Sequence, residues 1–174
     1  MPSTPKTAPA PPSARERLLA RQRPTLKMTI CDDLQLKADL EAARYALRRI
    51  KGEAADDPDN ANLKVAVAVA EQDVAEAQAA FDAAAIVLRF EALPRPAFEA
   101  LKKAHRPTEA QSEDGFEVNI DTLAPELVAA ASLDGLTVDD ARTFLDTWAE
   151  GEAALLFNTA WGVQNETRAD VGKG

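Results

Sequence analysis

Residues 32–84 read DDLQLKADLEAARYALRRIKGEAADDPDNANLKVAVAVAEQDVAEAQAAFDAA and contain two matched apolar stripes. The first stripe recurs at intervals of four and three residues and consists of Leu36, Leu40, Ala43, Leu47 and Ile50. The second keeps this spacing and consists of Leu63, Val67, Ala70, Val74, Ala77, Phe81 and Ala84. This is the heptad pattern of a coiled coil. Because only a short polar segment separates the stripes, we predict an antiparallel α-hairpin.

Polar residues mark the ends of these predicted helices. Asp32 and Asp33 suit the start of the first helix, both as capping residues and as negative charge near a helix N-terminus. Gly52 and the segment 54–60 (AADDPDN) predict the end of that helix and the turn that follows. The alternative is a dimerisation rod, in which the stripes pair between two molecules, so a homo-oligomer remains open.

Short alternating segments flank the hairpin. Apolar side chains occupy every second position in residues 25–31 (TLKMTIC), and residues 86–93 (IVLRFEAL) alternate in the same way. A period of two is typical of a half-buried strand. Because such short strands are marginal alone, we predict that they pair at the base of the hairpin. Residues 25–93 would then form one β-α-α-β unit.

Residues 94–165 are predicted to form a helical domain. Pro94 and Pro96 suit the entry to its first helix, and Pro107 suits the end of that helix. A polar loop is expected at residues 108–115.

Three further helices are predicted in this second part. Asp121 or Thr122 can cap the first, Thr137 and Asp140 resemble a capping box for the second, and the third begins near Gly151. The predicted fold class is therefore mainly α (α+β). It has a short two-stranded β pair at the base of an antiparallel α-hairpin, followed by a small C-terminal helical bundle.

Charge is distributed unevenly along the chain. Residues 1–27 hold six basic side chains and one acid, a net of +5, whereas residues 107–174 hold three basic side chains and fourteen acids, a net of −11. The proline-rich segment 1–24 is predicted to be a disordered basic tail, and residues 166–174 a flexible C-terminus. The overall net charge of -9 argues against binding to nucleic acids or anionic membranes.

The residue types that carry enzyme chemistry are scarce. His105 is the only histidine and is expected at a helix end, where it would interact with the helix dipole rather than act as a base. Cys31 is the only cysteine and is predicted to be a small buried apolar residue. One cysteine and one histidine cannot supply a structural zinc site, and no glycine-rich phosphate loop is present. We therefore expect no enzyme activity, no metal and no cofactor.

The acidic cluster of Asp56, Asp57 and Asp59 resembles part of a calcium-binding loop. It lacks the turn glycine and the closing glutamate at the required spacing. We therefore interpret the cluster as a solvated turn.

Aromatic side chains near the C-terminus supply the candidate partner-binding residues, which are Trp148, Phe157 and Trp161. Large aromatic residues dominate protein interfaces, but a small domain also needs them inside, and a place in the core is the favoured interpretation.

The start of the chain has no apolar run suited to a signal peptide. No segment approaches the roughly 20 apolar residues that span a bilayer. These features predict a cytoplasmic protein that does not enter the membrane.

Four segments, taken in order, resemble one protein family. They are TLKMTICDDL (25–34), VLRFEALPRPAFEALKKAHRPTEAQ (87–111), FEVNIDTLAPELVAAAS (116–132) and LTVDDARTFLDTWAEGEAALLFNTAWGVQN (136–165). Over about residues 25–165, their order and spacing are similar to those of the tail assembly chaperones of long-tailed phages, particularly phages and prophages of actinobacteria. None of these segments is a catalytic motif. Family members often have a second proline where Arg106 stands, so that loop is expected to differ here.

The resemblance implies a role in building phage tails. Such chaperones bind the helical tape measure protein, keep it soluble, help recruit the major tail protein, and leave before the tail is complete. The expected location is then the host cell cytoplasm and not the mature virion. A longer form often arises by ribosomal frameshifting, and a slippery run encoding Gly172, Lys173 and Gly174 is one hypothesis for its site.

Two other functions remain open at this point. The first is a virion structural component, such as a minor tail or head–tail connector protein. The second is a coiled-coil adaptor whose basic tail contacts nucleic acid.

Overall fold

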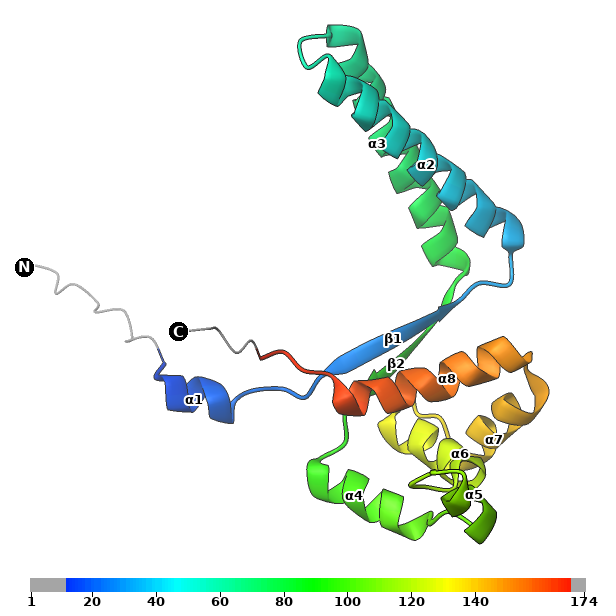
Figure 1. Ribbon diagram of the computed structural model, residues 1–174. Helices are drawn as coiled ribbons and strands as arrows, with labels where there is room; N and C mark the ends of the chain where they lie inside the picture. Colours follow the sequence, from blue (N-terminus) through cyan, green and yellow to red (C-terminus); the bar gives the residue numbers. More distant parts are fainter. Residues whose placement is uncertain (1–11, 170–174) are drawn as a thin grey trace, which may run out of the picture.

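The computed structural model describes residues 12–169, which form a mainly α fold with one pair of strands (Figure 1). The elements are α1 (Ala14–Leu19), β1 (Thr25–Ile30), α2 (Leu34–Asp56), α3 (Ala61–Ala84), β2 (Ile86–Glu91), α4 (Arg95–Ala104), α5 (Glu109–Glu113), α6 (Ile120–Ala131), α7 (Val138–Thr147), α8 (Glu150–Gly162) and the 3₁₀ helix η1 (Val163–Asn165). The helices α2 and α3 project as a long hairpin, the arm, from the group of β1, β2, α4–α8 and η1, which we call the body. The predicted fold class is confirmed.

The antiparallel α-hairpin predicted from the two stripes is present in the arm. Leu40 is only 3% exposed and Ala70 is also buried, while most other positions of the seam are half-buried. Ala84, the last predicted seam position, is exposed. Across the seam, Lys51 Nζ lies 2.7 Å from Glu71 Oε1. The two helices pack mainly on each other, and a seam between only two helices leaves few side chains fully buried.

The first helix of the arm begins where predicted but ends later. Asp33 caps α2, and its carboxylate accepts hydrogen bonds from two backbone N–H groups of the first turn. The helix was expected to end at Gly52, yet it continues to Asp56. A glycine inside a helix costs roughly 0.5–1 kcal/mol, which lowers stability without stopping the helix. The chain leaves the helical conformation at Asp57 because the following Pro58 disfavours that conformation in the residue before it.

The two predicted strands pair in an antiparallel manner at the base of the arm. Leu26 lies opposite Phe90 and Met28 lies opposite Leu88, so the apolar side chains of both strands share one face. Met28, Leu88 and Phe90 are buried on that face. Because β1 leads into α2 and β2 follows α3, this strand pair joins the arm to the body (Figure 1).

One core serves the strands and the C-terminal helices together. Phe90 of β2, Leu127 of α6 and Leu156 of α8 are all fully buried in a single apolar cluster. The sequence interpretation expected two separate units, residues 25–93 and 94–165. The core instead runs through both. The strands belong with the body because their apolar face is covered by α6 and α8, and the arm is the part that stands alone.

Two boundaries predicted within the body are wrong. Residues 108–115, expected to be a polar loop, contain the short helix α5, which begins with a capping box. The helix α6 is capped by Asn119 rather than by Asp121 or Thr122. The capping box predicted at the start of α7 is confirmed.

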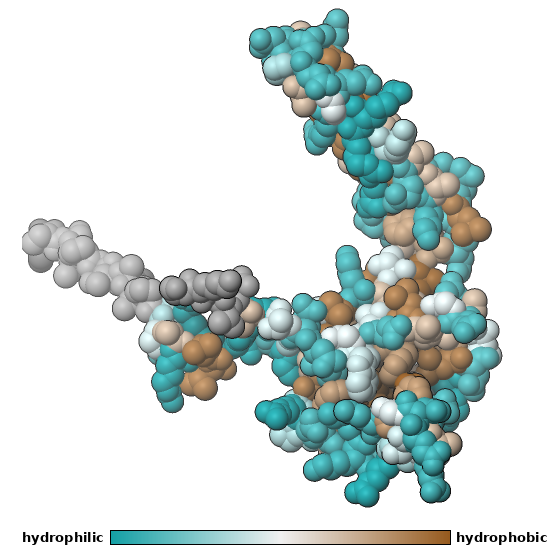
Figure 2. Space-filling view, in the orientation of Figure 1, coloured by the Kyte–Doolittle hydropathy of each residue, from teal (hydrophilic) through white to brown (hydrophobic). Residues whose placement is uncertain are grey.

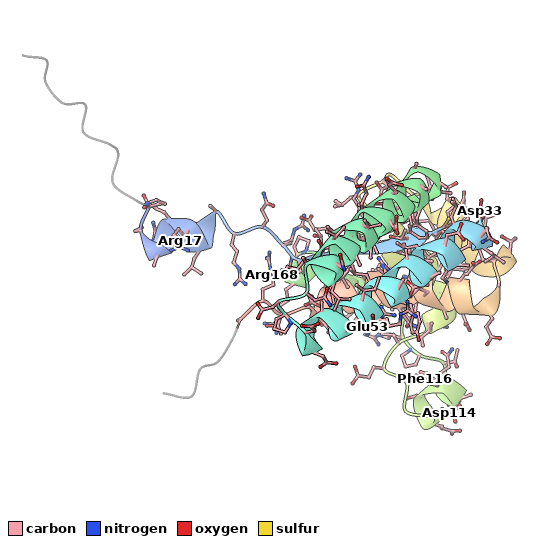
Figure 3. The ribbon with its side chains drawn as sticks, turned by 90° about the horizontal axis from the view of Figure 1, so that it is seen from above. Arg17, Asp33, Glu53, Asp114, Phe116 and Arg168 are labelled. Carbon is pink, nitrogen blue, oxygen red and sulfur yellow. The ribbon has the colours of Figure 1, made fainter. Side chains whose placement is uncertain are left out.

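The segment 1–24, predicted to be disordered, contains the helix α1. The side chain of Ser13 accepts a hydrogen bond from the backbone of Glu16, and the Glu16 carboxylate accepts one from the backbone of Ser13. This reciprocal capping box explains a short helix in which no side chain is buried. Figure 3 shows α1 standing away from the rest of the molecule. The first eleven residues of the predicted tail lie outside the described part of the chain.

The C-terminal segment that follows η1 has no helix or strand in residues 166–169. Within it, the Arg168 guanidinium donates a hydrogen bond to the backbone oxygen of Gln22. Residues 170–174, which include the hypothetical frameshift position, lie outside the described residues.

Candidate functional site

An open groove with a volume of about 970 Å³ lies between α6, α7 and α8. Its apolar lining includes Leu145, Trp148 and Phe157, which are half-buried. Its exposed acidic residues, one from each helix or its start, are Asp121, Asp146 and Glu150. The groove therefore combines an apolar floor with an acidic rim.

The corner of the groove is formed by Trp148. The helix α7 ends at Thr147, and Trp148 takes an extended conformation while its backbone N–H donates to the Phe144 oxygen at 3.0 Å. The indole ring stacks on the Phe144 ring, with centroids 4.7 Å apart and planes inclined by 17°. This stack holds the ring in place in the free protein, so a partner would lose little affinity to ordering it.

The acids of the rim differ in their effect on the helices that carry them. Glu150 stands in the first turn of α8, where negative charge is favoured by the helix dipole. Asp146 stands in the last turn of α7, where negative charge is unfavourable. Residues that lower the local stability of their helix occur mostly at functional sites. Among the acids of the rim, Asp146 is therefore the one whose position most strongly suggests a role in binding.

Only two of the three predicted partner-binding residues line the groove, Trp148 and Phe157. Trp161 lies beside Phe157, with ring centroids 5.9 Å apart, and meets Phe98 of α4 edge to face, with centroids 5.5 Å apart. All three are half-buried and pack against the core. Trp148 and Phe157 thus serve both the core and the groove, while Trp161 fastens α8 to α4.

His105 is a buried connection between helices, with 8% of its surface exposed. One ring nitrogen lies 3.0 Å from Thr122 Oγ1 and the other lies 3.0 Å from Glu126 Oε2. The backbone oxygen of His105 also accepts a hydrogen bond from Asn119 N. The predicted position at the end of α4 is confirmed, but its partners on α6 were not foreseen. With both nitrogens engaged, the ring is placed to fasten α4 to α6.

Cys31 is half-buried rather than buried as predicted. It lies between β1 and α2, where its thiol donates to the backbone oxygen of Asp33 at 3.6 Å. The predicted solvated turn is present, and Asp57 accepts a hydrogen bond there from the Asn60 side chain.

Within residues 12–169, no group of three or more histidine, cysteine or acidic side chains is gathered so as to hold a metal ion. In the same part of the chain, none of the helices combines the length and the apolar character needed to cross a membrane.

The rim of the groove was missed by sequence reasoning, although two residues of its floor were found. Asp121, Asp146 and Glu150 come from three different helices. Their meeting depends on how these helices pack, which no spacing in the sequence contains. The one local signal was an acid, Asp146, at the C-terminal end of a predicted helix.

Taken together, the arm, the strand pair and the grooved helical body define a mainly α protein with a surface suited to binding. No known protein family, curated protein or solved structure matches the chain significantly. We therefore infer the function from the geometry of the groove.

Proposed function

We propose that this protein is a tail assembly chaperone of a long-tailed phage, which binds the tape measure protein, keeps it soluble and helps recruit the major tail protein. The observation that supports this most directly is the groove between α6, α7 and α8, with its apolar floor and acidic rim. Its chemistry suits an amphipathic helix that carries basic residues beside its apolar stripe.

The apolar floor accounts for affinity in this proposal. A helix laid in a groove anchors itself through apolar side chains spaced three, four and seven residues apart. Leu145, Trp148 and Phe157 offer such side chains an apolar surface. A tape measure protein is a long helix whose apolar stripes must be covered before the tail tube surrounds them, and this surface would cover part of one stripe.

The acidic rim accounts for selectivity and for release. Exposed charges speed association and exclude partners of like charge more than they add affinity. Asp121, Asp146 and Glu150 are exposed, so their ion pairs with a partner would be weak and easily exchanged. A chaperone that must leave before the tail is complete needs such reversible contacts. The net charge of -9 would also help to keep the complex soluble.

A small-molecule site or an enzyme is less well supported by the same groove. Sites for small molecules place a few polar groups within an apolar pocket to fix the ligand. Here the acids stand on the exposed rim, and within residues 12–169 no buried side-chain polar atom lacks a hydrogen-bond partner. We therefore propose a binding function without catalysis.

The direct test is co-expression with the tape measure protein encoded in the same tail gene cluster. We expect the tape measure protein to remain in the supernatant after centrifugation and to co-purify with this chain. Expressed alone, it should pellet. If the two proteins are both soluble separately and do not co-purify, the proposal is wrong.

Two variants would locate the contact. Asp146→Lys reverses a rim charge without harming α7, because a cation suits the C-terminal end of a helix. Its control is Glu113→Lys, an equal charge change at the exposed C-terminal end of α5, outside the groove lining. We expect Asp146→Lys to reduce co-purification severalfold and Glu113→Lys to leave it unchanged.

The second variant fills the groove. Ala154→Trp places a large side chain on an exposed lining position, and Ala100→Trp places the same side chain on an exposed position of α4. Only Ala154→Trp should block binding. Equal binding by both variants would remove the groove from the proposal.

Purified particles discriminate this function from that of a structural component. A chaperone should be absent or scarce by mass spectrometry of virions, whereas a connector or minor tail protein should be present in a fixed ratio to other tail proteins.

A further inference from the structure

The helix α1 carries two large apolar side chains that the rest of residues 12–169 leaves mostly exposed. Leu18 is 66% exposed and Leu19 is 71% exposed. They are contributed by a helix of six residues that has no buried side chain. Figure 2 shows the resulting apolar patch on α1. A helix this short is marginal in water, and its capping box alone defines it here.

Basic side chains surround this apolar patch. Arg15 stands three and four residues before Leu18 and Leu19, so it lies on the same side of the helix. Arg17 and Arg21 are also exposed and are four residues apart. The only acid of the helix, Glu16, is occupied with the cap, and its hydrogen bonds to Ser13 lower the pKa of its carboxyl. The short helix therefore presents leucines flanked by uncompensated positive charge.

The groove of the body is complementary to α1 in both respects. Its floor is apolar, and its rim consists of three exposed acids: Asp121, Asp146 and Glu150. The helix α1 is thus a short example, within this chain, of the basic amphipathic helix that the groove is proposed to bind.

Contacts of the residues that follow α1 hold this helix away from the groove of its own molecule. Three contacts hold the residues after α1: Arg168 with the Gln22 oxygen, the ion pair of Arg23 with Glu91, and Ala92 N with the Pro24 oxygen. These contacts leave Ala20 and Arg21 as the free connection, so Leu19 can move within roughly 10 Å of Gln22.

The acidic end of the groove lies far from α1. The helix α1 stands beyond the C-terminal end of α8, whereas Glu150 of the rim lies in the first turn of that helix (Figure 1). From Glu150 to Gly162, α8 rises about 18 Å. A second molecule can therefore bring its α1 to this end of the groove, which the tethered α1 of the same molecule does not meet.

We infer that α1 of one molecule docks in the groove of a second copy, with Leu18 and Leu19 on the apolar floor and its arginines beside the acidic rim. A contact made by one short helix is far below the roughly 1,200 Å² of a stable interface, so the association is weak and depends on concentration. The docked α1 keeps the apolar floor covered until a longer helix displaces it. This last point rests on the proposed function, because it takes the tape measure helix as the competitor.

The test of self-association uses full-length chains in sedimentation velocity over a range of concentrations. The wild-type chain should associate as concentration rises, and Leu18→Glu with Leu19→Glu should remain monomeric. The control is Leu34→Glu, which changes a leucine of the arm that is 76% exposed, and it should associate like the wild type. A wild-type chain that stays monomeric at millimolar concentration, or a double variant that associates normally, would overturn the inference.

Mixing complementary variants tests the site itself. The double leucine variant keeps an intact groove, and Ala154→Trp keeps an intact α1 with a blocked groove. Each should be monomeric alone, and their mixture should form a one-to-one complex. Association of Ala154→Trp with itself would show that α1 binds elsewhere and would contradict the inference.

The competition has its own readout. At a concentration where half of the grooves hold an α1, the double leucine variant should bind the tape measure protein with about twofold better apparent Kd than the wild type. If self-association follows the pattern above and the tape measure protein does not bind, the proposed function fails while the docking of α1 stands. If the tape measure protein binds and no self-association occurs, the docking of α1 fails while the proposed function stands.

Discussion

The carboxylate of Asp134 accepts three hydrogen bonds from Arg89. The backbone N–H of Arg89 donates to Oδ2 at 2.6 Å, and the guanidinium donates to Oδ1 from Nε at 3.1 Å and from Nη2 at 2.6 Å. Beside these bonds, Leu133 N donates to the Arg89 oxygen at 2.8 Å. The loop between α6 and α7 thereby covers the free edge of β2, which would otherwise expose unpaired backbone groups.

We predict that Asp134 makes stability depend on pH. The hydrogen bonds from the Arg89 side chain, followed by the one from its backbone, lower the pKa of the Asp134 carboxyl in the folded protein. A lowered folded-state pKa adds stability above the unfolded-state value of about 3.9, and this stability is lost as pH falls through the folded-state value. Asp134→Asn should therefore reduce the Tm at pH 7, and the difference from the wild type should shrink below about pH 4. Thermal unfolding followed by circular dichroism at both pH values measures this.

The matched control is Asp146→Asn, which removes an acid with no hydrogen bond to another element. It should leave the Tm at pH 7 almost unchanged. A Tm difference for Asp134→Asn that is the same at pH 3 and pH 7 would contradict the assignment to this carboxylate.

We predict that the arm unfolds separately from the body. Leu40→Ala removes a buried side chain of the seam and should destabilise the arm by about 2–5 kcal/mol. Both tryptophans, Trp148 and Trp161, lie in the body, so their fluorescence reports the body alone, whereas far-ultraviolet circular dichroism reports all helices. The variant should lose part of its helical signal at a lower temperature while the fluorescence transition stays in place. Leu34→Ala, at an exposed position, should change neither signal, and a matching shift of both signals in Leu40→Ala would show that the two parts unfold together.

Much of the arm could be predicted from sequence because its information is local. The seam repeats every three and four residues, and Asp33 caps α2 directly before the first apolar position. The strand register was partly within reach, because a shift by one residue would separate the apolar faces of the two strands, whereas a shift by two would keep them together. The short helix α1 was not predicted, although its capping box of Ser13 and Glu16 is visible in the sequence.

The site could be predicted only in part because it is assembled from distant residues. His105 meets Thr122 and Glu126, which are 17 and 21 residues away. The segment between His105 and α6 contains α5, and its sequence does not show how the chain turns to bring these side chains together. Trp148 and Phe157 could be singled out as aromatic residues, but the acids around them gain meaning only once three helices have packed.

We predict that His105 stabilises the body. His105→Ala removes two hydrogen bonds, each worth about 0.5–1.5 kcal/mol, so it should cost about 1–3 kcal/mol. Urea unfolding followed by tryptophan fluorescence measures this free energy. The control is Arg106→Ala at the neighbouring exposed position, for which we expect a change within about 0.5 kcal/mol. Equal midpoints for the two variants would show that the histidine connection adds nothing.

We predict opposite effects for alanine at two glycines. A Cβ at Gly52 or at Gly135 would meet no atom within 4 Å, so backbone conformation alone decides the outcome. Gly52 lies inside α2, where alanine should stabilise the arm by about 0.5–1 kcal/mol. Gly135 has a φ of 76°, where alanine should destabilise the body by about 1–2 kcal/mol. The helical transition of the arm and the fluorescence transition of the body report the two changes, and effects of the same sign would contradict the argument.

The pairing of Ile30 with Ile86 is the last rung of the β ladder, three residues short of α2 on one strand and one residue past α3 on the other. Antiparallel neighbours at such a rung are commonly joined by a turn of only two residues. The whole arm therefore occupies the place of a β-turn and is an insertion in an ordinary β-hairpin. Neither Leu40 nor Ala70 belongs to the core cluster of the body. Evolution or an engineer can therefore lengthen, shorten or exchange the arm in steps of a heptad while the body keeps its fold.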